Sequence, residues 1–126
     1  MEQGARIVLV ESNPTDVRWF RLAIEGLRPE PALTVVDGGP NTLQQIRELL
    51  PDVIVSAWRL PFYEAPELIE ATRAIPALKN VPIAVLTMFP KDPKELESLG
   101  ILRWFTKPIN AGQIEDLLAL IKKRTV

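Results

Sequence analysis

The side chains that could do chemistry in this chain are carboxylates, hydroxyls and ammonium groups, because its 126 residues include no histidine and no cysteine. Ser–His and Cys–His hydrolysis are therefore excluded, as are disulfides and a zinc site of the usual kind. The polar candidates that stand at the ends of apolar segments are Glu11, Ser12, Thr87 and Lys107. Whether these side chains can act together depends on the elements that carry them.

Five short apolar segments, rich in β-branched residues, alternate with amphipathic stretches along the chain. A continuous apolar run is typical of a strand buried on both faces of a parallel sheet. The predicted strands are residues 7–10, 32–36, 51–57, 81–86 and 101–105. The alternation predicts an α/β fold with five βα units, in which helices cover both faces of one parallel sheet.

Capping residues predict where the helices begin. Asn13, Asn41, Asp92 and Asn110 each precede an amphipathic stretch, and Gln44 and Gln113 complete capping pairs; a further helix is predicted to start at Pro66. Gly100 is expected to end a short fourth helix. On the first helix, Trp19 and Phe20 are both expected in the core.

Right-handed crossovers favour the flavodoxin-like, doubly wound strand order 2-1-3-4-5. In such sheets, binding sites form beyond the carboxyl ends of the strands, at the switch between strands one and three. The predicted pocket residues are Glu11, Ser12, Ala57, Trp58, Thr87 and Lys107.

Length and charge limit the remaining classes. We expect residues 1–126 to form a single domain, with 47% apolar and 25% charged residues. The net charge of −1 gives no electrostatic reason to expect nucleic acid or a membrane surface as the main partner. No apolar run is long enough to span a membrane, and the first residues lack a signal-peptide pattern, so a cytoplasmic location is expected.

The chain resembles the receiver domain of bacterial two-component response regulators from Arg6 to Arg124. Four segments carry this resemblance: Val10–Pro14, Pro51–Pro61, Leu86–Thr87 and Thr106–Pro108. In that family, an acidic pair and an aspartate at the end of the third strand bind Mg²⁺, and the aspartate accepts a phosphoryl group from a kinase's phosphohistidine. A threonine or serine and a lysine contact the phosphoryl oxygens.

The family's pattern is incomplete in this chain. Glu11, Thr87 and Lys107 match it, but Ser12 replaces the second acid and Ala57 stands at the phosphoacceptor position. A methyl group can neither attack phosphorus nor bind a metal, and Glu11 alone is a poor Mg²⁺ site. The resemblance therefore implies a pseudo-receiver without phosphoacceptor, metal or cofactor. Without its aspartate partner, Lys107 is expected to reach Glu11 or water.

Neither neighbouring candidate is expected to replace the missing aspartate. Ser56 should point to the opposite face of the strand from Ala57, because successive strand side chains alternate. Asp52 belongs to the other end of the same strand.

The first functional hypothesis is that the chain is a signalling module and not an enzyme. It would bind a protein of a two-component pathway, or a second copy of itself, without being phosphorylated. Its expected contact face contains Met88, Phe89 and Trp104 with the exposed side of the last helix. In the alternative, Trp104 is buried against helix four. A second hypothesis, a flavodoxin-like module for a small ligand or nucleotide, has no glycine-rich loop after strand one to support it.

Overall fold

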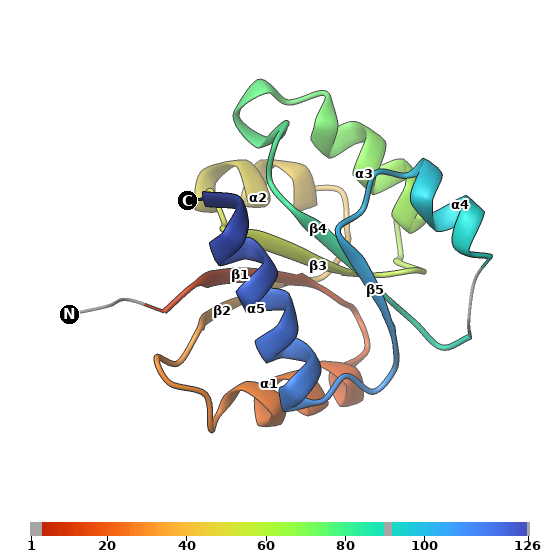
Figure 1. Cartoon of the computed structure of the whole chain (residues 1–126). Helices are drawn as coiled ribbons and strands as arrows, with labels where there is room; N and C mark the ends of the chain where they lie inside the picture. The colour runs from red at the N-terminus through yellow and green to blue at the C-terminus, as the bar shows by residue number, and fades with distance from the viewer. Residues whose placement is uncertain (1–3, 90–91, 126) are drawn as a thin grey trace.

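Five parallel strands form one sheet with helices on both faces (Figure 1). The structure is a computed structural model that describes residues 4–89 and 92–125, with side chains up to residue 121. The strand order is β2-β1-β3-β4-β5, so the predicted flavodoxin-like topology is confirmed. No helix in the described ranges is long and apolar enough to cross a membrane. The elements are β1 (Arg6–Val10), α1 (Pro14–Ile24), β2 (Ala32–Val36), α2 (Thr42–Leu49), β3 (Val53–Ala57), α3 (Ala65–Arg73), the 3₁₀ helix η1 (Pro76–Leu78), β4 (Ile83–Thr87), α4 (Pro93–Ser98), β5 (Arg103–Thr106) and α5 (Ala111–Thr125).

Alternating strand side chains build two separate apolar layers. One layer packs β1 residues Ile7 and Leu9 with α1 and α5; the other packs Val8 and Val10 with α2, α3 and α4. Figure 1 shows the same division, with α1 and α5 on one side of the sheet and α2 and α3 on the other. Because β1, β3 and β4 are buried on both faces, their sequences are almost entirely apolar.

The prediction that Trp19 belongs to the core is wrong. Trp19 is 52% exposed, whereas the adjacent Phe20 is 1% exposed and packs in the α1–α5 layer. Neighbouring helix residues point about 100° apart, so only one of the two can face the sheet.

Side-chain caps start three of the helices as predicted. The Asn13 side chain accepts the backbone N–H groups of Thr15 and Asp16, Asp92 caps α4 in the same way, and Asn110 and Gln113 exchange two hydrogen bonds.

One predicted cap and one predicted helix start need correction. Helix α2 begins directly after Asn41, as predicted, but without the expected capping pair. Asn41 makes no side-chain cap, and Gln44 instead donates to Glu48 one turn later. Helix α3 begins at Ala65, one residue before the predicted Pro66, because Glu64 and Glu67 form a capping box.

The β4 and β5 strands extend further toward the carboxyl edge than predicted. Thr87 is the last residue of β4, and β5 covers Arg103–Thr106 in place of residues 101–105. The backbone N–H of Lys107 then donates to the carbonyl of Thr87 at 2.8 Å, which continues the ladder past the end of β5. The two candidate site residues are thereby held at one edge of the sheet.

Candidate functional site

The ends of four strands carry the predicted site residues. Glu11 follows β1, Ala57 ends β3, Thr87 ends β4 and Lys107 follows β5. Backbone hydrogen bonds continue beyond the strand ends, from Glu11 N–H to Val36 and from Trp58 N–H to Leu86, both at 2.9 Å. The sheet therefore fixes where each of these side chains begins.

Lys107 joins two carboxylates that are far from it in the sequence. Its Nζ donates to Oε2 of Glu11 at 2.7 Å and to Oδ2 of Asp16 at 2.8 Å. The three side chains are 13%, 3% and 23% exposed, respectively. The predicted contact between Lys107 and Glu11 is present, and we call Glu11, Asp16 and Lys107 the charged cluster.

Glu11 uses both carboxylate oxygens. While Oε2 accepts from Lys107, Oε1 accepts the backbone N–H groups of Ser12 and Asn13, both at 3.1 Å. A buried carboxylate is costly unless it is paired and hydrogen-bonded, and these three donors meet that requirement. Glu11 thus ties the end of β1 both to the start of α1 and to the loop after β5.

The charged cluster keeps Lys107 protonated. Burial by itself lowers the pKa of the Lys107 ammonium, but the hydrogen bonds to Asp16 and Glu11 and the negative charges of both carboxylates outweigh this effect. The net result is a pKa above the ordinary lysine value.

Sequence reasoning missed Asp16. This residue lies in the first turn of α1, where the Asn13 cap accepts its N–H, and an acid there is favoured by the helix dipole. The signal that could have found it is its place three residues after the cap of the helix that follows β1. That turn lies at the carboxyl edge, within reach of the loop after β5.

A hollow of about 350 Å³ opens beside the charged cluster at the carboxyl edge. Three predicted pocket residues, Trp58, Thr87 and Lys107, line it. The other lining residues, Arg59, Leu86, Met88 and Phe89, were not assigned to the pocket from the sequence.

The other three predicted pocket residues do not line this hollow. Glu11 is buried and contacts Lys107, Ser12 is exposed, and Ala57 is 1% exposed at the end of β3. Because Ala57 presents only a methyl group, the last residue of β3 contributes no polar side-chain atom to the carboxyl edge.

Thr87 directs its hydroxyl to its own loop. Oγ1 donates to the carbonyl of Phe89 at 2.8 Å and accepts the Phe89 N–H at 3.3 Å. These bonds hold the start of the β4–α4 connection, where Met88 and Phe89 are 64% and 72% exposed.

Trp104 is only partly available for a contact face. Its side chain is half-buried and packs against the apolar layer that includes Leu96 of α4. Trp104 thus lies between the two expectations, because it packs on this layer without being fully buried. The alternation along β5 explains this, since Phe105 faces the opposite layer.

Ser56 and Asp52, the two neighbouring polar residues of the third strand considered from the sequence, both lie away from the charged cluster. Ser56 is fully buried and donates to the carbonyl of Ala57 at 2.9 Å. Asp52 lies at the opposite end of β3, where its carboxylate accepts the backbone N–H of Arg6 at 2.7 Å.

The donor set does not fit a divalent metal ion. Lys107 already lies between Glu11 and Asp16, Ser12 is exposed, and Ala57 has no ligand atom. Among the residues that the structure describes, no three His, Cys, Asp or Glu side chains are grouped to hold a metal. Mg²⁺ demands near-ideal octahedral oxygen coordination, which an ammonium between the two carboxylates opposes.

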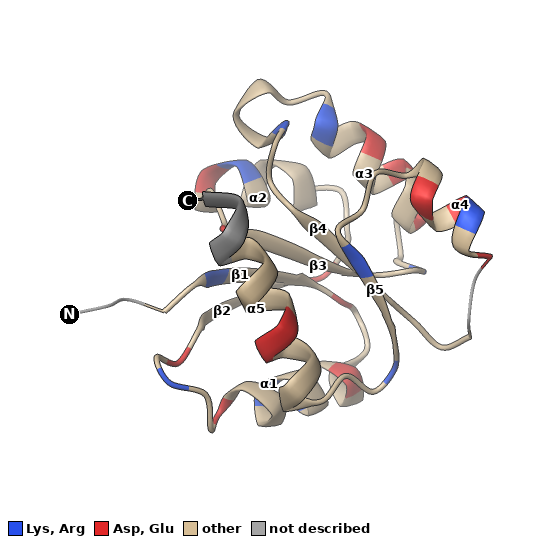
Figure 2. Ribbon diagram, in the orientation of Figure 1, with Lys and Arg blue, Asp and Glu red and all other residues tan. Residues whose placement is uncertain are grey.

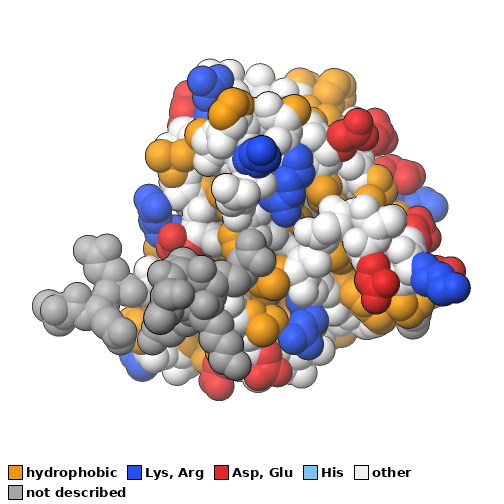
Figure 3. Space-filling view, turned by 45° about the horizontal axis from the view of Figure 1, so that its top comes forward, with side chains coloured by type: hydrophobic (Ala, Val, Ile, Leu, Met, Phe, Trp, Pro, Cys, Tyr) orange, Lys and Arg blue, Asp and Glu red, His pale blue; other side chains and the backbone are white. Residues whose placement is uncertain are grey.

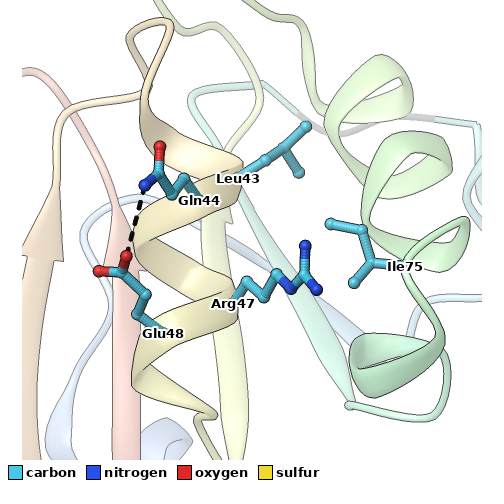
Figure 4. A pocket seen from close by; sticks show the side chains of 5 residues that line it. All are labelled: Leu43, Gln44, Arg47, Glu48 and Ile75. Carbon is cyan, nitrogen blue, oxygen red and sulfur yellow. Dashed lines mark hydrogen bonds between the residues drawn. The ribbon is translucent and has the colours of Figure 1, made fainter.

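A larger, more open hollow of about 570 Å³ lies between α2 and Ile75, which comes two residues after the end of α3. Figure 4 shows Leu43 and Arg47 pointing from α2 toward Ile75, while Gln44 and Glu48 are joined by a hydrogen bond along the other side of the helix. None of these residues was predicted as a site residue from the sequence. No residue of the charged cluster lines this hollow.

No protein-family model matches the chain, and no curated protein sequence matches it either. Solved structures do match closely in shape. The chemotaxis response regulator CheY4 of Vibrio cholerae has a TM-score of 0.80 at 20% identity, with 94% of this chain and 99% of that chain covered.

Two further solved structures extend this likeness. The receiver domain of the sensor histidine kinase PA1611 from Pseudomonas aeruginosa, which holds a magnesium ion in its active site cleft, has a TM-score of 0.78 at 23% identity, covering 91% and 94% of the two chains. The signal receiver domain of a modulated diguanylate cyclase from Desulfovibrio desulfuricans has a TM-score of 0.80 at 18% identity, covering 98% of each. The chain therefore has the fold of response regulator receiver domains.

Proposed function

We propose that this chain is a pseudo-receiver, a receiver domain that serves two-component signalling by binding a protein partner and is not itself phosphorylated. The observation that carries the proposal is the state of the receiver pocket. Ala57 occupies the end of β3, and the lysine after β5 is bonded to two carboxylates of its own chain.

Each group that phosphoryl transfer requires is missing or already engaged. A nucleophile must attack phosphorus while cations neutralise the equatorial oxygens, yet Ala57 has no nucleophilic atom. Lys107 uses two of its three N–H donors within the charged cluster. The Thr87 hydroxyl is bonded to the backbone of Phe89. These observations also support a role outside enzyme catalysis.

The exposed apolar side chains beside the pocket support a protein partner. Met88 and Phe89 protrude from the β4–α4 connection, and the Thr87 hydroxyl fixes the backbone that carries them. Methionine and phenylalanine are enriched in protein interfaces. We include in the proposed face the part of Trp104 that remains exposed. We propose that this face binds a pathway protein or a second copy of the chain in the cytoplasm.

Surface charge favours a protein over a nucleic acid. Figure 2 shows acidic and basic residues mixed along α3 and α4, and on the face drawn in Figure 3 both signs are interspersed with hydrophobic side chains. With a net charge of −1, the chain has no overall positive field to attract phosphate backbones.

Mass spectrometry and a binding assay test the two halves of the proposal. Incubation of the chain with acetyl phosphate and Mg²⁺ should add no mass of about 80 Da, the size of one phosphoryl group. Partner capture from native lysate, or self-association in sedimentation, should be the same with and without acetyl phosphate. A hydroxylamine-labile phosphoryl group on the chain would refute the proposal.

Matched surface variants locate the contact face. Met88→Ser with Phe89→Ser should abolish the interaction, whereas Leu22→Ser should retain it, because Leu22 is 48% exposed on α1 rather than beside the pocket. Thermal unfolding of all variants serves as the control for folding. Binding that survives the double substitution would contradict the proposed face.

A further inference from the structure

We infer that Lys107 is a built-in cation: its ammonium takes the place that a metal ion would need between Glu11 and Asp16, and it excludes divalent ions from the site. This inference concerns the resting chain and holds whether or not a partner binds at Met88 and Phe89.

The geometry is that of one cation shared by two carboxylates. One oxygen of Glu11 and one of Asp16 lie within 2.8 Å of the same nitrogen. The second oxygen of Glu11 is occupied by the two backbone N–H groups that precede α1. The orientation of the Glu11 carboxylate is thus fixed by its own backbone, independently of the cation.

The ammonium joins three elements that a metal ion would otherwise have to join. Glu11 follows β1, Asp16 lies in the first turn of α1, and Lys107 begins the loop between β5 and α5. The backbone N–H of Lys107 is itself anchored to Thr87. The backbone already holds the lysine and both carboxylates near one another. The ion pairs of the charged cluster therefore form without the loss of translational entropy that binding a free ion would require.

Displacement of the ammonium by a metal ion would be unfavourable. The Lys107 side chain is only 13% exposed, and the hollow into which it could move is lined by Arg59 and Thr87 as well as by Trp58, Leu86, Met88 and Phe89. A lysine ammonium that leaves Glu11 and Asp16 would lose both hydrogen bonds, and it would be repelled by the divalent cation and by Arg59, which lines the hollow.

Removal of the charge alone tests the inference. Lys107→Met keeps most of the apolar stem and deletes the ammonium. We expect the wild-type melting temperature to be indifferent to millimolar Mg²⁺, Ca²⁺ or Mn²⁺ at constant ionic strength. Lys107→Met should have a lower melting temperature than the wild type in the sodium salt. When a divalent salt replaces the sodium salt, the variant should recover at least half of that difference in melting temperature.

Mn²⁺ binding, followed by water proton relaxation, is the direct measurement. Wild type should not bind Mn²⁺ at the site, Lys107→Met should bind it, and the double variant Glu11→Gln with Lys107→Met should lose that binding. Lys79→Met is the matched control, because Lys79 is exposed at the end of η1 and should leave both readings at wild-type values.

Each outcome decides the inference. Wild-type Mn²⁺ binding that Glu11→Gln abolishes would overturn it, since the ammonium would then not exclude metal. Lys107→Met that folds but ignores divalent ions would also overturn it, as would a variant that stays unfolded in every salt. Folding of Lys107→Met that depends on a divalent ion would support it.

Discussion

Replacing Glu11 with glutamine removes one negative charge from the charged cluster and changes little in the shape of the side chain. In the wild type, Oε1 accepts two backbone N–H groups and Oε2 accepts the Lys107 ammonium. An amide can keep only one of these roles, because it has one oxygen and its NH₂ group is a donor. The Glu11→Gln variant therefore places a donor against an ammonium or against the backbone N–H groups.

The expected cost follows from burial. A hydrogen bond to a charged group contributes about 1.5–3 kcal/mol, and breaking a buried ion pair costs about 3–5 kcal/mol. The Glu11 side chain is only 3% exposed, but Lys107 keeps Asp16 as a partner, which is itself 23% exposed. We therefore expect a loss of about 2 kcal/mol in the free energy of unfolding, or about 8 °C in melting temperature.

Urea denaturation at neutral pH, followed by circular dichroism, measures this loss. Glu25→Gln is the control, because Glu25 is exposed at the end of α1 and the same chemical change there should cost less than about 0.5 kcal/mol. A Glu11→Gln variant as stable as the control would refute the conclusion that the charged cluster stabilises the carboxyl edge.

Two further predictions concern single titrating or polar groups. The pKa of Lys107 is raised in the folded state. Its contribution to stability is therefore complete below the unfolded-state pKa of about 10.5 and is lost as the pH rises through the higher folded-state value. In urea titrations above about pH 10, wild type should thus lose stability more steeply than Lys107→Met, and parallel curves would contradict this assignment. Thr42→Val should leave stability unchanged or raise it by up to about 1 kcal/mol, because Oγ1 of this buried residue has no hydrogen-bond partner within the described part of the chain. The matched variant Thr87→Val should lose about 1 kcal/mol, since its hydroxyl bonds to Phe89, and equal denaturation midpoints for the two variants would disprove the distinction.

The sequence by itself determined the sheet and its order. A continuous apolar run buries all its side chains only in a strand that is covered on both faces. The βα alternation with right-handed crossovers then leaves few possible topologies. Local caps such as Asn13 and the pair of Asn110 with Gln113 were equally predictable, because donor and acceptor are at most three residues apart. The placement of Glu11 and Lys107 at one edge follows from the same topology.

Only the tertiary structure decided how the edge residues pair. Asp16 and Lys107 are separated by 91 positions, and no periodicity relates the first turn of α1 to the loop after β5. Likewise, Trp104 and Trp19 are both hydrophobic, yet one is half-buried and the other exposed, because the neighbouring elements decide which side of a strand or helix is covered. Local pattern sets which face a side chain takes, but the distance between two side chains on different elements depends on how those elements pack.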